Sequence, residues 1–277
     1  MMRGLLKTVT ALLVLIAAPA AMADTLDTVL AARPDADKAR DQYRHPKETL
    51  TFFGITPGMT VIDVLPGDWY GRILAPYLGA DGTYIGSAYP NERYKRIFGA
   101  ERYESRRERI ESFETRFPDS VAGYADTPPA TATFRTWNAP EDMHGTVDAY
   151  LIIRALHHMN RYGPADMDAA AAEAFKLVKP GGIVGIVQHR APEGAGDDWA
   201  IGSKGYLKQS RVVAAFTGAG FVLEASSDIN ANPKDQPGEG DFVWRLPPSL
   251  AKGETDRAAY QAIGESDRMT LKFRKPS

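Results

Sequence analysis

The chain alternates short apolar runs with helical patterns from residue 60 almost to its end, and this alternation constrains the fold more than any other feature. Several of the runs are apolar on both faces, as buried parallel strands are. Between them lie helical patterns, with Pro164 suited to a helix start and Gly218 and Gly220 suited to a helix end. The predicted strands span residues 60–65, 83–87, 131–135, 147–153, 182–188, 221–227 and 268–275. We therefore predict an α/β fold with a doubly wound, Rossmann-like, mostly parallel sheet whose last strand is an antiparallel edge strand.

The first residues carry the pattern of a secretory signal peptide. Two basic residues precede an apolar run from Ala11 to Ala18, and residues 21–23 (Ala-Met-Ala) offer a small-x-small cleavage site. That run is shorter than the roughly 20 residues that span a bilayer, which favours cleavage over a membrane anchor. We expect a signal peptide over residues 1–23, a single domain with an N-terminal helical extension over residues 24–277, and a periplasmic or secreted protein.

Charge and cysteine content bear on the class of partner. Removal of residues 1–23 takes away Arg3 and Lys7 and leaves 31 Lys and Arg against 35 Asp and Glu, a formal charge of −4. That balance does not favour nucleic-acid binding, and no second apolar span predicts an integral membrane segment in the mature chain. Because the chain has no cysteine, an exported protein of this sequence must rely on its hydrophobic core rather than on disulfides. The oligomeric state stays open.

Two regions depart from the alternation. Residues 94–117 are densely charged, yet four apolar residues recur within them and predict one apolar stripe on a solvated helix. The stripe consists of Tyr103, Ile110, Phe113 and Phe117. Residues 229–241 are rich in Pro, Gly, Asn and Asp, which predicts an exposed, mobile loop. Before the first strand, the prolines at positions 34 and 46 predict helical pieces broken at those points.

A Pro-Gly-Asp turn joins the first strand to the next helix. In open parallel sheets, ligands bind at the carboxyl ends of the strands, where they approach the backbone and a helix N-terminus. Gly67 allows such an approach, and Asp63, near the end of the strand, is suited to receive a cationic amino group. Asp68 is equally suited to cap the helix that begins at Trp69. The sequence lacks the G-x-S-x-G elbow of hydrolases and the phosphate-binding P-loop, and G-x-G-x-x-G does not follow the first strand.

Several longer segments form a more specific pattern. They are "HPKETLTFFGITPGM" (45–59), the helix "WYGRILAPYLG" (69–79), "VDAYLIIRALHHMNRYG" (147–163), "LVKPGG" (177–182) and the tail "DRMTLKFRKP" (267–276). In these segments the chain resembles a family of exported predicted methyltransferases of the class I, S-adenosylmethionine-dependent type. The resemblance covers essentially the whole chain after residue 23. It implies a methyltransferase fold, S-adenosyl-L-methionine as the cofactor and an acceptor that the sequence does not name.

The resemblance also implies a set of site residues along the carboxyl edge of the sheet. It puts the methionine part of the cofactor beside the first turn, the ribose at the end of the second strand and the adenine after the third. The implied residues are Asp63, Pro66, Gly67, Asp68, Trp69 and Tyr70 for the methionine part, Ser87 for the ribose, and Asn138 and Ala139 for the adenine. The catalytic candidates Arg154, His157 and His158 follow the fourth strand and are implied to face the methyl-transfer side.

Two positions depart from the family pattern. Relatives usually have a proline and three glycines before the Trp-Tyr pair, where this chain has Pro66-Gly67-Asp68. The second strand lacks the usual ribose-binding acid, so Ser87 has to hydrogen-bond in its place, at a cost of about 1 kcal/mol or more for each hydrogen bond lost. These departures keep an alternative open: a non-catalytic periplasmic protein that binds another small molecule on a degenerate methyltransferase fold.

His157 and His158 invite two further interpretations. Adjacent residues of a helix point about 100° apart, and no zinc-type spacing accompanies the pair, so the pattern does not favour a metal site. We expect one histidine to pack or cap and the other to line the cleft, where a pKa near neutrality suits a general base. Trp69 and Tyr70, which follow the Pro-Gly-Asp turn, suit either the hydrophobic core or cation–π contact with a cationic ligand.

Overall fold

The structure is a computed structural model that describes residues 25–277. Its centre is a sheet in the order β3-β2-β1-β4-β5-β8-β7, with β6 paired to the end of β5. The strands are β1 (Thr60–Val64), β2 (Thr83–Ala88), β3 (Ala130–Arg135), β4 (Val147–Ile153), β5 (Val178–Ala191), β6 (Leu207–Lys208), β7 (Val222–Ser227) and β8 (Arg268–Arg274). Strands β1 to β5 pair in parallel, and β8 runs antiparallel to β5 and β7. The predicted doubly wound, mostly parallel sheet is confirmed.

The antiparallel strand lies one position in from the edge of the sheet. β8 is hydrogen-bonded to β5 on one side and to β7 on the other, so β7 is the outermost strand. The buried side chains of Leu271 and Phe273 suit this inner position. Because β8 runs opposite to β5, its first residue, Arg268, pairs with His189 near the carboxyl end of β5. The start of β8 therefore lies at the edge where such sheets bind ligands.

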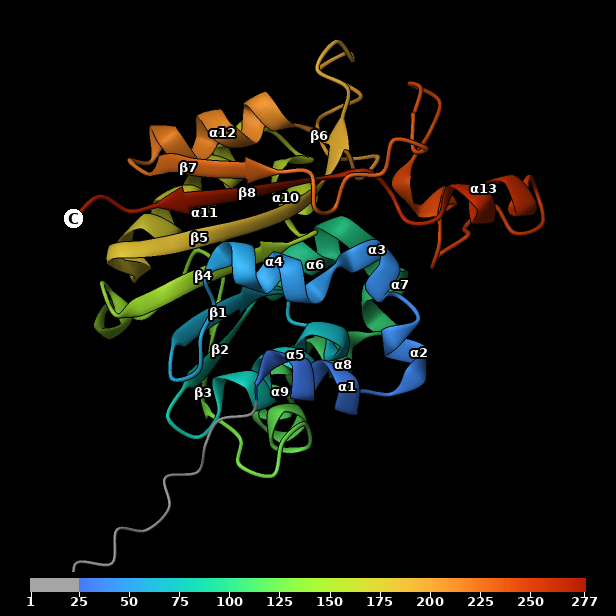
Figure 1. Cartoon of the computed structure of the whole chain (residues 1–277). Helices are drawn as coiled ribbons and strands as arrows, with labels where there is room; N and C mark the ends of the chain where they lie inside the picture. The colour runs from blue at the N-terminus through green and yellow to red at the C-terminus, as the bar shows by residue number, and fades with distance from the viewer. Residues whose placement is uncertain (1–24) are drawn as a thin grey trace, which may run out of the picture.

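Helices cover both faces of the sheet (Figure 1). Helices α1, α4, α5 and α9 supply buried residues to one face, and α10, α11 and α12 supply them to the other. The helices are α1 (Leu26–Ala32), α2 (Asp35–Lys38), α3 (Asp41–Arg44), α4 (Pro46–Phe53), α5 (Asp68–Leu78), α6 (Asn91–Phe98), α7 (Ala100–Glu104), α8 (Arg107–Glu111), α9 (Phe113–Ala122), α10 (Leu156–Asn160), α11 (Pro164–Leu177), α12 (Gln209–Gly218) and α13 (Arg257–Ile263). Short 3-10 turns span Glu141–Met143 and Val243–Arg245.

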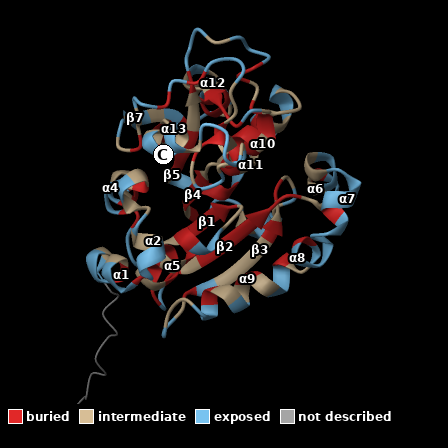
Figure 2. Ribbon diagram, turned by 90° about the vertical axis from the view of Figure 1, so that its right-hand side faces the viewer, coloured by how far each residue is buried: buried red, intermediate tan, exposed pale blue. Residues whose placement is uncertain are grey.

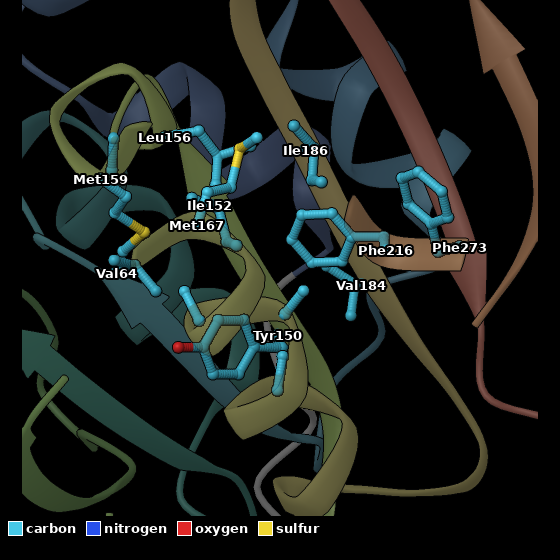
Figure 3. Close-up of a cluster of buried hydrophobic side chains, with 14 of the residues drawn as sticks. Val64, Tyr150, Ile152, Leu156, Met159, Met167, Val184, Ile186, Phe216 and Phe273 are labelled. Carbon is cyan, nitrogen blue, oxygen red and sulfur yellow. The ribbon is translucent and has the colours of Figure 1, made fainter. Parts of the chain in front are cut away.

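The apolar runs of the sequence supply both faces of the central strands. In β1, Val61 packs on the α5 face, whereas Ile62 and Val64 pack on the α11 face. Figure 3 shows part of the buried cluster on the α11 face, in which Tyr150 of β4 lies among aliphatic side chains and Phe216 of α12 approaches β5. Buried residues accordingly concentrate in the strands, and exposed residues lie on the outer helices (Figure 2). Burial on both faces is typical of parallel strands inside a doubly wound sheet.

The chain before β1 forms four short helices, broken where the prolines predict. Helix α1 ends at Ala32, two residues before Pro34, and α4 begins at Pro46. Proline suits the first position of a helix because its missing N–H would have no partner there. The predicted signal peptide, residues 1–23, lies outside the described residues. Within residues 25–277, the structure contains no helix of the length and apolarity needed to cross a membrane.

The charged segment over residues 94–117 buries its apolar stripe as predicted. The four stripe residues are each at most 8% exposed. They come from three short helices, α7, α8 and α9, rather than from one continuous helix. Ser105 and Ser112 lie at the two breaks, consistent with the preference of serine for helix ends over helix interiors.

The prediction of an exposed loop over residues 229–241 is wrong at two polar positions. Asn230 is buried and donates its side-chain amide to threonine hydroxyls of α4 and β8, at 3.0 Å each. Asp235 is also buried; it pairs with Arg245 at 2.7 Å and accepts the Tyr206 hydroxyl at 2.9 Å. The composition indicated irregular backbone correctly, but it did not reveal that polar side chains of the loop satisfy buried partners from distant segments.

Gly185 of β5 lies where α4 packs on the sheet, and a larger residue should destabilise this contact. A Cβ at this position would come within 2.8 Å of the buried side chains of Leu151 and Phe53. We predict that Gly185→Ala lowers the free energy of unfolding in urea by about 1–3 kcal/mol. The exposed Gly194, whose Cβ would meet no atom within 4 Å, is the control, and its change to alanine should alter stability by at most about 0.5 kcal/mol. Equal stability of the two variants would contradict this packing.

Candidate functional site

The turn after β1 leaves open space beside its glycine. Leu65 adopts a left-handed conformation (φ 56°) and donates its backbone N–H to the Ser87 carbonyl at 2.7 Å. Pro66 is half-buried and Gly67 is exposed, and a Cβ added to Gly67 would meet no atom within 4 Å. The backbone of Gly67 (φ −126°, ψ 158°) is extended, so the turn itself does not require glycine. The geometry fits a ligand that approaches the backbone at this point.

Of the two roles predicted for Asp68, helix capping is wrong. Gly67 occupies the N-cap position of α5, and Asp68 is the first helical residue. The exposed carboxylate of Asp68 accepts a hydrogen bond from the Tyr124 hydroxyl at 2.8 Å. Its negative charge still interacts favourably with the positive end of the helix dipole.

Asp63 lies near the end of β1 with its carboxyl group buried. The residue is 3% exposed and accepts a hydrogen bond from the Tyr84 hydroxyl at 2.9 Å. Burial raises the pKa of this carboxyl to about 7, although the Tyr84 hydrogen bond and the positive charge of Arg154 both act to lower it. Such a group exchanges its proton near neutral pH, and a cationic ligand beside it would favour the ionised form.

Trp69 and Tyr70 belong to the packing of the N-terminal helices. Their rings lie 4.7 Å apart, edge to face, and both residues are buried. Trp69 donates its indole N–H to a backbone carbonyl of α2 at 3.0 Å. The guanidinium groups of Arg33 and Arg44 lie 5.2 and 4.6 Å from the centre of its ring. The cations that face Trp69 in this structure are therefore the protein's own arginines.

The end of β2 is closed by side chains of the protein. Ser87 is fully buried, and its hydroxyl lies 2.8 Å from that of Thr136. Tyr89, also fully buried, donates its hydroxyl to the Ala155 carbonyl at 3.0 Å. Because β1 lies between β2 and β4, Tyr89 crosses the end of β1 to reach Ala155. Contact between Ser87 and a ribose would require these side chains to rearrange.

Asn138 and Ala139 lie in the turn after β3. The side chain of Asn138 is exposed, and its backbone N–H donates to the Arg135 carbonyl at 2.9 Å. The backbone N–H of Ala139 donates to the Glu173 carboxylate at 3.2 Å. Since β3 is three strands from β4, about 14 Å across the sheet, these residues lie apart from Arg154.

His157 and His158 differ in burial, as expected of neighbours on a helix. His157 is 3% exposed, and its Nδ1 lies 3.3 Å from the side-chain oxygen of Gln188. Gln188 donates its amide to the Gly205 carbonyl, so its oxygen is an acceptor and Nδ1 of His157 carries the proton. Burial lowers the pKa of both imidazoles, that of the half-buried His158 to about 4. Burial therefore places the pKa of both rings below the neutral range that we expected for a general base.

The predicted site residue Arg154 lies in a group of arginines near Asp63 and Tyr70, and we did not predict the other three from the sequence. This arginine cluster consists of Arg40, Arg44, Arg154 and Arg268. Glu265, which is 4% exposed, accepts hydrogen bonds from Arg40 at 2.6 Å, Arg44 at 3.2 Å and Arg268 at 2.6 Å. The Tyr70 hydroxyl lies in the field of three of these arginines. An isolated charge at the start of an apolar strand, as in "RMTLKF", is the sequence signal that could have revealed Arg268.

His189 is a second residue that the sequence did not single out. It lies near the end of β5 opposite Arg268, and its Nδ1 is 2.5 Å from the Ser266 hydroxyl. Burial and the positive charges of Arg268 and Arg154 lower the pKa of its imidazole. Among residues 25–277, no three His, Cys, Asp or Glu side chains gather in an arrangement suited to a metal ion. The side chains gathered at this end of the sheet are therefore mainly the guanidinium groups of the arginine cluster and the neutral imidazole of His189.

Comparison with known proteins supports the fold. No family model and no curated protein matches the sequence. An S-adenosylmethionine-dependent methyltransferase from Aquifex aeolicus aligns with a TM-score of 0.50 and 15% identity, over 75% of this chain and 94% of its own. Geranyl diphosphate methyltransferase in complex with S-adenosylmethionine aligns with a TM-score of 0.50 and 14% identity, over 90% of this chain and 94% of its own. The cyclase SpnF aligns with a TM-score of 0.50 and 18% identity, over 87% of this chain and 81% of its own. The protein therefore has the fold of the class I methyltransferases.

We predict that Asp63 makes the protein less stable as pH rises. Its folded pKa of about 7 exceeds the ordinary 3.8, so stability present below pH 4 is lost as pH increases through 7. Asp63→Asn keeps an oxygen acceptor for Tyr84 but cannot ionise. Between pH 4 and 7, the free energy of unfolding of the variant, measured in urea, should rise relative to that of the parent by up to roughly 1.4 kcal/mol per pH unit. A stability difference that stays constant across this range would contradict the burial of the ionisable carboxyl.

Proposed function

We propose that the protein is an S-adenosylmethionine-dependent methyltransferase that acts on a small-molecule acceptor. The observation that carries the proposal is the β1 turn, where Gly67 has open space beside it and Asp63 holds a buried carboxyl four residues earlier in the chain. This turn lies at the carboxyl end of the strand where open α/β sheets bind ligands. The fold adds support, because neighbours with the same fold are described as S-adenosylmethionine-dependent or were solved in complex with that cofactor.

The residues of the β1 turn fit the methionine part of this cofactor better than Ser87, at the end of β2, fits its ribose. Asp63 is suited to the amino group, and Gly67 leaves room for the chain of the ligand. Ser87 would have to exchange its contact with Thr136 for one with the ribose. The cofactor supplies an electrophilic methyl group when bound. Since methyl transfer needs chiefly alignment of the two reactants, the weak basicity of His157 does not argue against it.

The proposed site of action is outside the cytosol, in the periplasm or the medium. The basic residues, apolar run and Ala-Met-Ala sequence within residues 1–23 support this part of the proposal. N-terminal sequencing of the protein from fractionated cells should find a chain that begins at Asp24 in the exported fraction. A chain in the cytosol that still begins at residue 1 or 2 would contradict it.

The closed end of β2 favours a second candidate function. Ser87 and Tyr89 are fully buried and already hydrogen-bonded, so the protein as it stands offers a small ligand the β1 turn but not the ribose position. A non-catalytic protein that binds another small molecule at Gly67 is consistent with this arrangement. The cyclase SpnF shares the fold, and it illustrates that this fold is not tied to one reaction.

Calorimetric titration with S-adenosylhomocysteine separates the two functions. We predict micromolar binding, around −8 kcal/mol, to the parent protein. Gly67→Val should weaken binding at least about tenfold without loss of stability, because its side chain enters open space on an extended backbone. Gly194→Val is the matched control, since its side chain also enters open space but lies elsewhere. An absence of heat at millimolar ligand would overturn the methyltransferase proposal and leave the binding protein.

A further inference from the structure

The four positive charges of the arginine cluster exceed the single negative charge of Glu265, the carboxylate that three of them meet. Both oxygens of Glu265 are already engaged, one by Arg40 and the other by Arg268, with Arg44 between them. Burial lowers the pKa of Arg44 to about 9 and that of Arg154 to about 10, so both stay charged at pH 7. Excess positive charge away from water is unfavourable unless an anion offsets it.

Arg154 is the member of the cluster without a partner. Within residues 25–277, its half-buried guanidinium makes neither a hydrogen bond nor an ion pair. Its backbone N–H donates to the Val187 carbonyl at 2.7 Å, which holds the residue at the end of β4 in a left-handed conformation (φ 59°). That conformation is unfavourable for a residue with a side chain, and such strain is concentrated at functional sites.

Two neutral hydrogen-bonding groups lie within the electrostatic influence of this unpartnered guanidinium. The Tyr70 hydroxyl makes no hydrogen bond with the described part of the chain, and Arg154 is the charged group that acts on it most strongly. His189 has its Nδ1 against Ser266, so its Nε2 is the ring nitrogen left to meet a ligand. Asp63 is an acid that interacts with both Tyr70 and Arg154, and its carboxyl is bonded to Tyr84. The surroundings therefore suit an anion rather than a cation.

We propose that Arg154 binds a carboxylate of the methyl acceptor, with Tyr70 and His189 as further hydrogen-bonding groups. A guanidinium matches the two oxygens of a carboxylate with two parallel N–H···O bonds. The cluster lies at the ends of β4, β5 and β8, whereas the predicted ribose and adenine positions lie at β2 and β3. The anion thus belongs on the side of the sheet away from the predicted adenosine. Assignment to the acceptor rests on the proposed methyl transfer, whereas the carboxylate site itself does not.

The first experiment compares carboxylates with uncharged amides of matched shape. The pairs are acetate and acetamide, benzoate and benzamide, and succinate and succinamide, each titrated into the purified protein. At least one carboxylate should bind about tenfold or more tightly than its amide, and Arg154→Met should abolish this preference. The control, Arg211→Met, removes a half-buried arginine that pairs with Asp168 at 2.7 Å in another part of the fold, and it should keep the preference. No preference in the parent, or an unchanged preference in Arg154→Met, would overturn the proposal.

A stability measurement distinguishes a ligand-binding arginine from a structural one. Without ligand, Arg154→Met should have a higher thermal midpoint than the parent, because it removes a charge that forms no ion pair with any described residue and that lies among three other arginines. Arg154→Lys should keep the charge and fall between the two in carboxylate preference, since it lacks the planar fork. A lower midpoint for Arg154→Met would mean that the arginine stabilises the fold, against the proposal.

A third titration identifies the source of the carboxylate. S-adenosylhomocysteine carries a carboxylate, whereas 5′-methylthioadenosine lacks the amino-acid end. If Arg154→Met weakened the first ligand alone, the carboxylate would be the cofactor's and the assignment to the acceptor would fail. Equal affinities of parent and variant for both ligands, together with lost preference for the small carboxylates, would support the acceptor. A preference for carboxylates without any binding of S-adenosylhomocysteine would retain the anion site and reject methyl transfer.

Discussion

The carboxyl edge of the sheet depends on one buried carboxylate, that of Glu265. Three arginines meet it, one just before α3, one at the end of α3 and one at the start of β8. Removal of one partner from such a buried group leaves the others with uncompensated charge, so the set holds together as a unit. Arg44 also lies 4.6 Å from the ring of Trp69 in α5. Through these contacts the N-terminal helices, the β1 turn and the antiparallel strand form one wall of the candidate site.

The same wall sets the electrostatics of the site. A cationic sulfonium would be disfavoured beside unneutralised guanidinium groups, unless a carboxylate lies between them. Asp63 can supply one negative charge when it ionises, which its pKa of about 7 permits near neutral pH. An anionic acceptor at Arg154 would supply another. Binding of acceptor and cofactor would then be mutually favourable, because each offsets charge that opposes the other.

Much of the fold followed from apolar periodicity, and part of the site did not. Buried parallel strands need apolar residues on both faces, so each predicted strand appears with its ends displaced by four residues at most, and β4 appears with the predicted bounds. Arg44, Arg268 and His189 were not predicted because they are up to 224 residues apart in the sequence. Arg268 meets His189 through the register of β8 with β5, and Arg44 meets Arg268 through Glu265. Burial also cannot be read from composition: Asp235 lies in a loop of polar residues yet forms a buried ion pair. Helix α5 begins at Asp68, one residue before the predicted start, so Gly67 and not Asp68 occupies the N-cap position. A difference of one residue is within the usual uncertainty of helix ends.

The most direct measurement is a crystal structure of the protein grown with S-adenosylhomocysteine and a carboxylate selected by titration. We expect the amino-acid end of S-adenosylhomocysteine to lie over Gly67 beside Asp63, and the carboxylate to receive two hydrogen bonds from the Arg154 guanidinium. Density for the nucleoside away from the β1 turn, or an Arg154 side chain turned to pair with Glu265 and leave no anion bound, would contradict it.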